Sequence, residues 1–437
     1  MSNPKPFEHI ALEPLQKRRP TRLAKVERKL HVLHIGKYYP PHAGGMESHL
    51  EALCGELKRT VDLEVVVAAS NESGTQEELI DGVPVTRLAK LFNLRSAPFC
   101  PQMARRIRES NADIVHIHLP NPGAILAYLA SGHRGRLVVT YHSDVIRQRV
   151  LNRFFDPILR HALHRADAII VSSPNYIDSS DVLPLFRDKC RVIPFGIPLE
   201  PFQRPDNAQV TKLRRLYGPR IVLGVGRLVY YKGFEHLVEA MRFVDGRLVI
   251  VGSGPLHSAL EQKAENCGVK ERVTFLTNVE DVSPYYHAAD VFALPSVARS
   301  EAFGIVQLEA MACGKPVVNT DLDSGVPFVS LDGVSGVTVP PANPKALGQA
   351  LTSLMDDPLR SIAYGRAGQR RVKQHFSLQE MAGQTLALYR EATNPVFANN
   401  PRTLPERIRS ILKTGEAMKS PAESIALGAL QRKGMSA

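Results

Sequence analysis

Short apolar runs rich in valine and isoleucine recur along most of this chain, and each is followed by a stretch whose apolar residues have helical spacing. We expect the runs to form strands in two series. The first series comprises 31–35, 63–68, 113–118, 137–141 and 168–172, and the second comprises 221–225, 247–251, 272–276, 291–294 and 316–319. Strands that alternate with helices are typical of parallel sheets with crossover connections. The sequence therefore predicts an α/β protein with two doubly wound sheets.

The length of the chain favours two domains, because 437 residues exceed what one compact core usually holds. A proline-rich segment, IPFGIPLEPFQRPDN over 193–207, separates the two series of strands and is typical of an interdomain linker. We expect a basic extension over 1–30, a first domain over 31–200 and a second over 201–375. A further helical stretch reaches residue 392, and 393–437 form a tail.

The positive charge of the chain is concentrated in its terminal extensions. Residues 1–30 carry eight Lys or Arg and three acidic residues, whereas 391–437 carry seven and four, so 31–390 hold only +4 of the formal +12. Basic extensions suit contact with an anionic membrane surface, and a solvated leader is the alternative. The basic runs lack interleaved aromatic residues, which argues against nucleic-acid binding. The N-terminus lacks the apolar core of a signal peptide, and the apolar runs are too short to cross a bilayer, so we expect a cytoplasmic protein, peripheral at most on the inner face of the plasma membrane.

Two glycine-containing loops follow predicted strands and have the residues that phosphate binding needs. Gly44 and Gly45 precede a helix expected to begin near Met46, where backbone N–H groups can approach an anion. In GVGRLVYYKG, Arg227 and Lys232 follow the strand at 221–225 and can neutralise a diphosphate together. The third glycine of a dinucleotide-binding fingerprint is missing, which argues against a dehydrogenase.

The segment SEAFGIVQLEA holds two carboxylates eight residues apart, Glu301 and Glu309. We expect a helix that begins near Phe303, so that Glu309 lies about two turns in while Glu301 stays in the preceding loop. The unpaired N–H groups at the start of this helix belong to Phe303, Gly304 and Ile305. One carboxylate could then bind a ribose diol and the other could bind sugar hydroxyls.

Taken together, these motifs resemble those of glycosyltransferase family four, whose members have the GT-B fold and retain the configuration of the transferred sugar. The resemblance covers residues 31–390 in family order and includes VGSGPL over 251–256. It implies two Rossmann-like domains that enclose a cleft, with the acceptor bound by the first and the nucleotide-sugar donor by the second. It also implies that residues 376–392 form a helix that crosses back to the first domain.

The resemblance also implies roles for individual residues of the donor site. Arg227 and Lys232 correspond to the pair that binds the diphosphate, Glu309 to the ribose ligand and Glu301 to the carboxylate that orients the donor sugar. Gly45 corresponds to a backbone contact from the first domain. The departing phosphate helps to deprotonate the acceptor in this family, so no separate base is needed.

The segment TYHSD over 140–144 is similar to an active-site loop of some family members. His142 is therefore our candidate for positioning the sugar, although a histidine that ends a buried strand is often a structural residue. His118 and Asp144 are candidate acceptor contacts. The sequence DLD over 321–323 matches the D-x-D pattern of metal-dependent transferases, but the family resembled is usually metal-independent, so we expect no metal and no cofactor apart from the donor substrate.

The resemblance extends, with less detail, to the sugar. The TYHSD, AFGIVQLEAMA and TDLDSGVPFV segments look most like those of bacterial transferases that move mannose from GDP-mannose to polyprenyl-linked saccharides of surface polysaccharides. A transferase that uses UDP-glucose or UDP-N-acetylglucosamine is the alternative. A GT-B isomerase of nucleotide sugars is a third, and it would turn over the donor without an acceptor.

Overall fold

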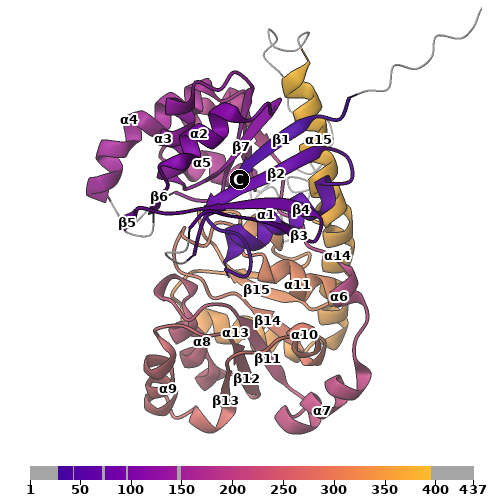
Figure 1. Ribbon diagram of the computed structural model, residues 1–437. Coiled ribbons are helices and arrows are strands. Elements are labelled where there is room, and N and C mark those ends of the chain that lie inside the picture. Colours follow the sequence, from indigo (N-terminus) through magenta and orange to yellow (C-terminus); the bar gives the residue numbers. More distant parts are fainter. Residues whose placement is uncertain (1–27, 43, 71–73, 95–96, 145–148, 395–437) are drawn as a thin grey trace, which may run out of the picture.

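The computed structural model describes residues 28–42, 44–70, 74–94, 97–144 and 149–394 (Figure 1). Nearly all of the expected tail and of the expected basic extension lie outside these residues. Two sheets dominate the fold, one in each lobe of the molecule. None of the described helices combines the length and apolar character that crossing a membrane requires.

The first sheet has eight strands in the order β10-β9-β8-β7-β1-β2-β4-β3, all parallel except for β3, which runs antiparallel to β4. The strands are β1 (His31–Ile35), β2 (Asp62–Ala68), β3 (Gln76–Ile80), β4 (Val83–Leu88), β7 (Ile114–Leu119), β8 (Arg136–Tyr141), β9 (Ala168–Val171) and β10 (Cys190–Val192). A separate hairpin joins β5 (Phe92–Leu94) to β6 (Ala97–Phe99). The helices of this lobe are α1 (Gly45–Leu57), α2 (Gln102–Glu109), α3 (Pro122–Ser131), α4 (Arg149–Arg165) and α5 (Pro174–Ser179).

The second sheet has six parallel strands in the order β13-β12-β11-β14-β15-β16. They are β11 (Ile221–Val225), β12 (Arg247–Val251), β13 (Val273–Leu276), β14 (Val291–Ala293), β15 (Val317–Thr320) and β16 (Gly336–Val339). The longer helices are α7 (Asn207–Tyr217), α9 (His257–Asn266), α13 (Pro344–Met355), α14 (Pro358–His375) and α15 (Leu378–Thr393), and the shorter ones are α6 (Glu200–Gln203), α8 (Phe234–Ala240), α10 (Ser283–Ala288), α11 (Val306–Ala312) and α12 (Val326–Val329).

Several helices begin where a capping side chain is followed by proline. Asn121, Asn343 and Asp357 each accept a hydrogen bond from the backbone N–H three residues later, and proline occupies the first helical position after each. The cap satisfies a donor that the helix leaves free, and proline has no N–H to satisfy. Local sequence therefore fixes where α3, α13 and α14 begin.

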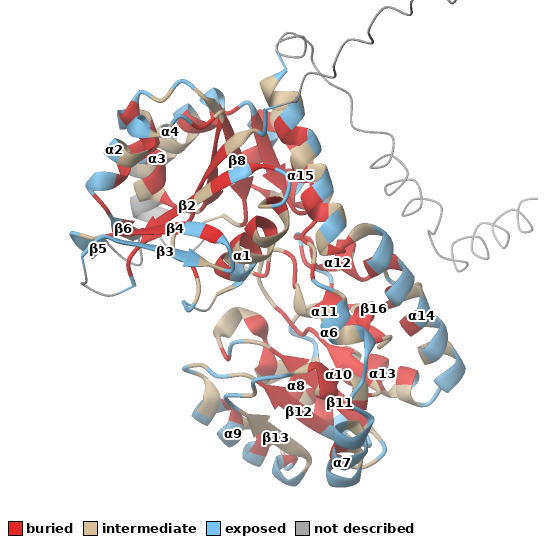
Figure 2. Cartoon of the chain, turned by 45° about the vertical axis from the view of Figure 1, so that its right-hand side comes forward, coloured by how far each residue is buried: buried red, intermediate tan, exposed pale blue. Residues whose placement is uncertain are grey.

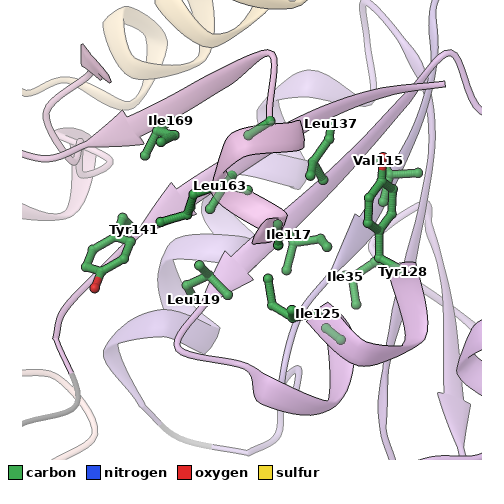
Figure 3. Packing of buried hydrophobic residues seen from close by; sticks show 14 of the residues in the cluster. Ile35, Val115, Ile117, Leu119, Ile125, Tyr128, Leu137, Tyr141, Leu163 and Ile169 are labelled. Atoms are coloured by element: carbon green, nitrogen blue, oxygen red, sulfur yellow. The ribbon is translucent and has the colours of Figure 1, made fainter. Parts of the chain in front are cut away.

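The central strands of each sheet are buried on both faces, because helices cover both sides (Figure 2). In the first sheet, alternate residues of each strand belong to different clusters: Val115 and Ile117 pack with Ile125 and Leu163 on one face (Figure 3), whereas Ile114 packs on the other face. The face on which Ile114 packs is completed by α15, which lies far along the chain. This helix contributes the side chains Met381, Ala382, Leu388 and Tyr389.

The C-terminal helix α15 lies against the first lobe, as Figure 1 shows, and contacts α1. The two passages between the lobes, near Ile197 and Ser377, run side by side in a parallel bridge. Gly196 fits there closely, because a Cβ on it would lie 2.4 Å from the carbonyl oxygen of Ser377.

Candidate active site

In both sheets the strand order reverses at one point, which is where doubly wound sheets bind ligands. The reversal lies between β1 and β7 in the first sheet and between β11 and β14 in the second. Arg227 and Lys232 follow β11, and Glu301 follows β14. The carboxyl ends of these adjacent strands thus bring together three charged residues that are far apart in sequence.

A buried ion pair joins two of these residues. The ammonium Nζ of Lys232 lies 2.5 Å from Oε2 of Glu301, and the side chains are about one-tenth exposed. The hydroxyl of Ser296 donates a hydrogen bond of 3.1 Å to the same carboxylate oxygen. Because each charge neutralises the other, the protein can hold both out of bulk water at the ends of the strands.

The loop that carries Lys232 is fixed against the loop after β14 by a close backbone approach. Gly233 has a φ of +65°, and a Cβ on it would lie 2.2 Å from the carbonyl oxygen of Pro295. The N–H of Val297 donates to the carbonyl of Tyr231 at 2.8 Å. Glycine at position 233 thereby lets Lys232 reach Glu301.

We expect Gly233→Ala to lower the free energy of unfolding by about 1–3 kcal/mol, because the new Cβ meets backbone and the positive φ is strained. Urea denaturation followed by circular dichroism measures this change. Gly268→Ala is the matched control, since Gly268 has a φ of +67° but no atom within 4 Å of its Cβ position. Equal effects of the two substitutions would contradict the close approach.

Arg227 differs from Lys232 in being exposed, and within the described part of the chain it forms no ion pair. Burial raises the pKa of the neighbouring Tyr231, on which the charges of Lys232, Glu301 and Arg227 also act. All three charged groups therefore lie near Tyr231. The exposed guanidinium of Arg227 is available to an anionic ligand.

Glu309 lies nearer to the start of its helix than the sequence predicts. Helix α11 begins at Val306 and not at Phe303, because Gly304 has a φ of +76° that a helix excludes, so Glu309 is in the first turn. Its Oε2 accepts a hydrogen bond of 2.6 Å from the hydroxyl of Tyr286. Burial raises the pKa of Glu309, and the Tyr286 hydrogen bond and the charge of Lys232 oppose this shift.

The residues just before α11 accept hydrogen bonds from its first turn and also pack against the first lobe. Phe303, Gly304 and Ile305 precede the helix, and the N–H groups of Gln307 and Leu308 in its first turn donate to the carbonyls of Gly304 and Ile305. The buried ring of Phe303 packs edge-on against Phe195, with centroids 5.1 Å apart. The ring centroid of Phe195 in turn lies 5.1 Å from that of His142 in the first lobe. The ring of Phe195 therefore connects Phe303 with His142.

His142 lies directly after β8, buried within a group of histidines. Its Nε2 is 3.2 Å from Nδ1 of His118, and the other nitrogen of His118 is 3.2 Å from Nδ1 of His34. Burial lowers the pKa of all three rings, that of His34 to about 3. Both ring nitrogens of His118 are thus engaged and its side chain is buried, a position that suits support of His142 rather than contact with an acceptor.

Asp144 connects the first lobe with the loop after β14 through Arg299, a residue that the sequence analysis missed. Its Oδ1 accepts hydrogen bonds from Tyr141 and Ser180, at 2.7 and 2.9 Å, and its Oδ2 lies 3.6 Å from Nη2 of Arg299. Arg299 also donates to the carbonyl of Ser179. The position of Arg299, two residues before Glu301, was the signal by which the sequence could have indicated it. Gly45, the remaining sequence candidate, is the first residue of α1.

Two trios of buried histidines have ring nitrogens close enough to hold a metal ion, His34 with His116 and His118, and His49 with His118 and His142. They share His118. Across the described ranges, no other set of three or more histidine, cysteine or acidic side chains has its ligand atoms this close together. Asp321 and Asp323 are therefore not part of such a set.

Comparisons with known proteins agree with this geometry. The model of the family "Glycosyltransferase Family 4" matches residues 43–201, and that of "Glycosyl transferases group 1" matches 207–371. The D-rhamnosyltransferase WbpZ of Pseudomonas aeruginosa is 35% identical to the chain, over 80% of this chain and 92% of the relative. The chain belongs to glycosyltransferase family 4.

Other relatives of this family 4 glycosyltransferase transfer mannose, according to their names. The O-antigen chain mannosyltransferase C of Escherichia coli is 32% identical over 82% of this chain and 98% of the relative. A GDP-mannose-dependent alpha-(1-6)-phosphatidylinositol monomannoside mannosyltransferase of Mycolicibacterium smegmatis is 32% identical over 81% and 95%. Sucrose-phosphate synthase from Thermosynechococcus elongatus has the same GT-B fold, with a TM-score of 0.71 at 24% identity over 85% of this chain and 100% of that one. The glycosyltransferase is thus a hexosyltransferase with a nucleotide-sugar donor and a saccharide acceptor.

Proposed function

We propose that the protein transfers an α-mannosyl group from GDP-mannose, with retention of configuration, to a lipid-linked saccharide in exopolysaccharide or O-antigen synthesis. The observation that carries the proposal is the convergence of Lys232, Glu301 and the nearby Glu309 at the carboxyl ends of β11 and β14. The names of the mannosyltransferase relatives support the choice of sugar and of GDP, and the O-antigen relative supports the choice of pathway.

The donor is assigned to the second domain, residues 201–375. Arg227 and Lys232 bind the two negative charges of the diphosphate, aided by the N–H groups of Phe303, Gly304 and Ile305 and, from the first domain, by that of Gly45. Glu309 accepts hydrogen bonds from the ribose diol, and Tyr286 holds its carboxylate in place. Glu301 binds hydroxyls of the sugar while it keeps its contact with Lys232.

The transfer step needs no cofactor and no metal in this proposal. The bond between C1 of the sugar and the diphosphate oxygen breaks, and a bond between C1 and the acceptor oxygen forms on the same face. The proton of the acceptor hydroxyl passes to the departing diphosphate. Lys232 and Arg227 stabilise the negative charge that develops on the leaving group, which is the main catalytic contribution of fixed cations.

The acceptor is assigned to the first domain, residues 31–200, with His142 beside the reacting sugar, stabilising positive charge through its ring or backbone, and Asp144 near the acceptor. A polyprenyl-linked acceptor would place the protein on the inner face of the plasma membrane. The basic segment 1–30 then supplies attraction to anionic lipid.

A thermal-shift titration of the full chain tests the donor. We expect GDP and GDP-mannose, present with a chelator at about 100 times their dissociation constants, to stabilise the protein by about 2.7 kcal/mol. UDP and UDP-glucose should produce little shift. Preference for the uridine pair would contradict the GDP assignment, and turnover of the donor without acceptor would favour the isomerase alternative.

A further inference from the structure

One face of the first sheet carries a group of buried histidines, of which the proposed transfer uses only His142. His34 on β1 is the register partner of His116 on β7, and His118 is the partner of Thr140 on β8. Side chains two residues apart in a strand share a face, so His116, His118, Thr140 and His142 point the same way. Helix α15 covers this face and contributes Tyr389 to it.

The polar atoms of this group form one continuous chain of hydrogen bonds. Oγ1 of Thr140 lies 2.7 Å from Nε2 of His116, whose Nδ1 lies 2.5 Å from the hydroxyl of Tyr389. The same hydroxyl lies 3.3 Å from Nε2 of His34. The chain continues at 3.2 Å from His34 to His118 and at 3.2 Å from His118 to Nε2 of His142.

The chain has a direction, because each neutral imidazole has one N–H donor and one acceptor nitrogen. Burial lowers the pKa of each of its four histidines and so favours the neutral rings. For the Oγ1 of Thr140, the described residues offer one hydrogen-bond partner, Nε2 of His116. A buried hydroxyl proton that lacks an acceptor is costly, so Thr140 donates.

The direction set by Thr140 determines every proton that follows. Nδ1–H of His116 donates to Tyr389, the hydroxyl of Tyr389 donates to His34, and the Nδ1–H groups of His34 and His118 donate to the next ring. Nε2 of His142 therefore accepts a hydrogen bond, and the proton of this ring is on Nδ1.

We propose that the chain from Thr140 through His116, Tyr389, His34 and His118 is a positioning device that fixes the tautomer and orientation of the His142 ring. Its value for catalysis rests on the proposed function, in which His142 lies beside the sugar. A ring held with a single N–H donor contacts the sugar without having to reorganise during the transfer. Tyr389 brings the C-terminal helix into this arrangement, although it touches no substrate.

The test is Tyr389→Phe in the full chain, labelled with ¹⁵N in histidine and studied by NMR without ligand. In the wild type, we expect the Nδ1 of His142 to have the chemical shift of a protonated nitrogen and Nε2 that of an unprotonated one. In Tyr389→Phe both should move to intermediate values, because two tautomers are populated. With donor and acceptor, we expect kcat to fall about tenfold, the lower end for loss of an outer partner of a functional histidine, with KM for the donor unchanged.

Tyr39→Phe is the matched control, since Tyr39 is buried in the same apolar cluster but its hydroxyl is outside the chain. It should leave both the histidine shifts and kcat as in the wild type. If Tyr389→Phe fails to fold, Thr140→Val removes the first donor of the chain and should produce the same mixture of tautomers.

The NMR result is independent of turnover, so failure of the mannosyl proposal would leave it intact. The proposal is wrong if His142 keeps a single Nδ1–H tautomer in both variants, or if kcat is unaffected in both while the tautomers change. It is also wrong if one equivalent of Zn²⁺ shifts these ring nitrogens together in the wild type, because the histidines would then be a metal site.

Discussion

The Lys232→Met variant should lose roughly 100-fold to 1000-fold in kcat/KM, the usual cost of removing one fixed group that stabilises developing negative charge. It should also lose about 3–5 kcal/mol of stability, because Glu301 would remain buried without its partner. The pair is separated by 2.5 Å and both side chains are about one-tenth exposed, so solvent cannot replace the lost ammonium. Initial rates of sugar transfer and urea denaturation measure the two effects.

A double variant, Lys232→Met with Glu301→Gln, separates stability from catalysis. Removing both charges should restore most of the lost stability, since neutral side chains are buried at lower cost. Activity should stay at least as low as in the single variant. A Lys232→Met protein with the kcat/KM of the wild type would refute the assignment of Lys232 to the diphosphate.

Glu309→Gln should weaken donor binding about 10-fold to 100-fold while leaving the free protein as stable as the wild type or more so. Affinity falls because a neutral amide replaces the charged acceptor of the ribose hydroxyls. Stability is kept because burial raises the pKa of Glu309, so the ionised carboxylate is disfavoured in the folded protein. Titration calorimetry with GDP and thermal unfolding measure the two quantities.

The pH dependence of this variant has a definite sign. Because the pKa of Glu309 is raised on folding, the folded protein holds this proton more tightly than the unfolded chain does. The resulting stabilisation of the wild type is fully present below the pKa of the unfolded state and is lost as the pH rises through the pKa of the folded state. The difference in Tm between Glu309→Gln and the wild type should therefore be largest near neutral pH and shrink on acidification. Glu271→Gln, at an exposed position, is the control. Unchanged GDP affinity in Glu309→Gln would contradict the ribose assignment.

The sequence predicts the long central strands well, because a strand buried on both faces reads as a continuous apolar run. Strands β1, β11 and β12 begin and end at the predicted residues. The edge strand β3 was missed, since its sequence QEELI is polar and exposed, and β4, β10 and β16 were missed as well. The antiparallel direction of β3 was missed with it.

The candidate site could be predicted where its residues belong to short motifs that directly follow a strand. Arg227, Lys232 and Glu301 follow strands, so the end of the sheet on which they lie follows from the alternating pattern. The start of α11 was predicted three residues early, because the positive φ of Gly304 comes from the loop and not from the helix pattern. The contacts of Tyr389 with His34 and His116, more than 270 positions away, have no sequence signal.

The packing of α15 sets the order in which the newly made protein can complete its fold. Strand β10 is the last strand of the first sheet to be synthesised, yet Met381, Leu388 and Tyr389 complete one face of that sheet. Translation from residue 192 to residue 393 takes roughly 10–40 seconds at typical rates. During that time the nascent first lobe leaves an apolar surface uncovered beside the ribosome, and any fragment that ends before residue 378 keeps that surface open.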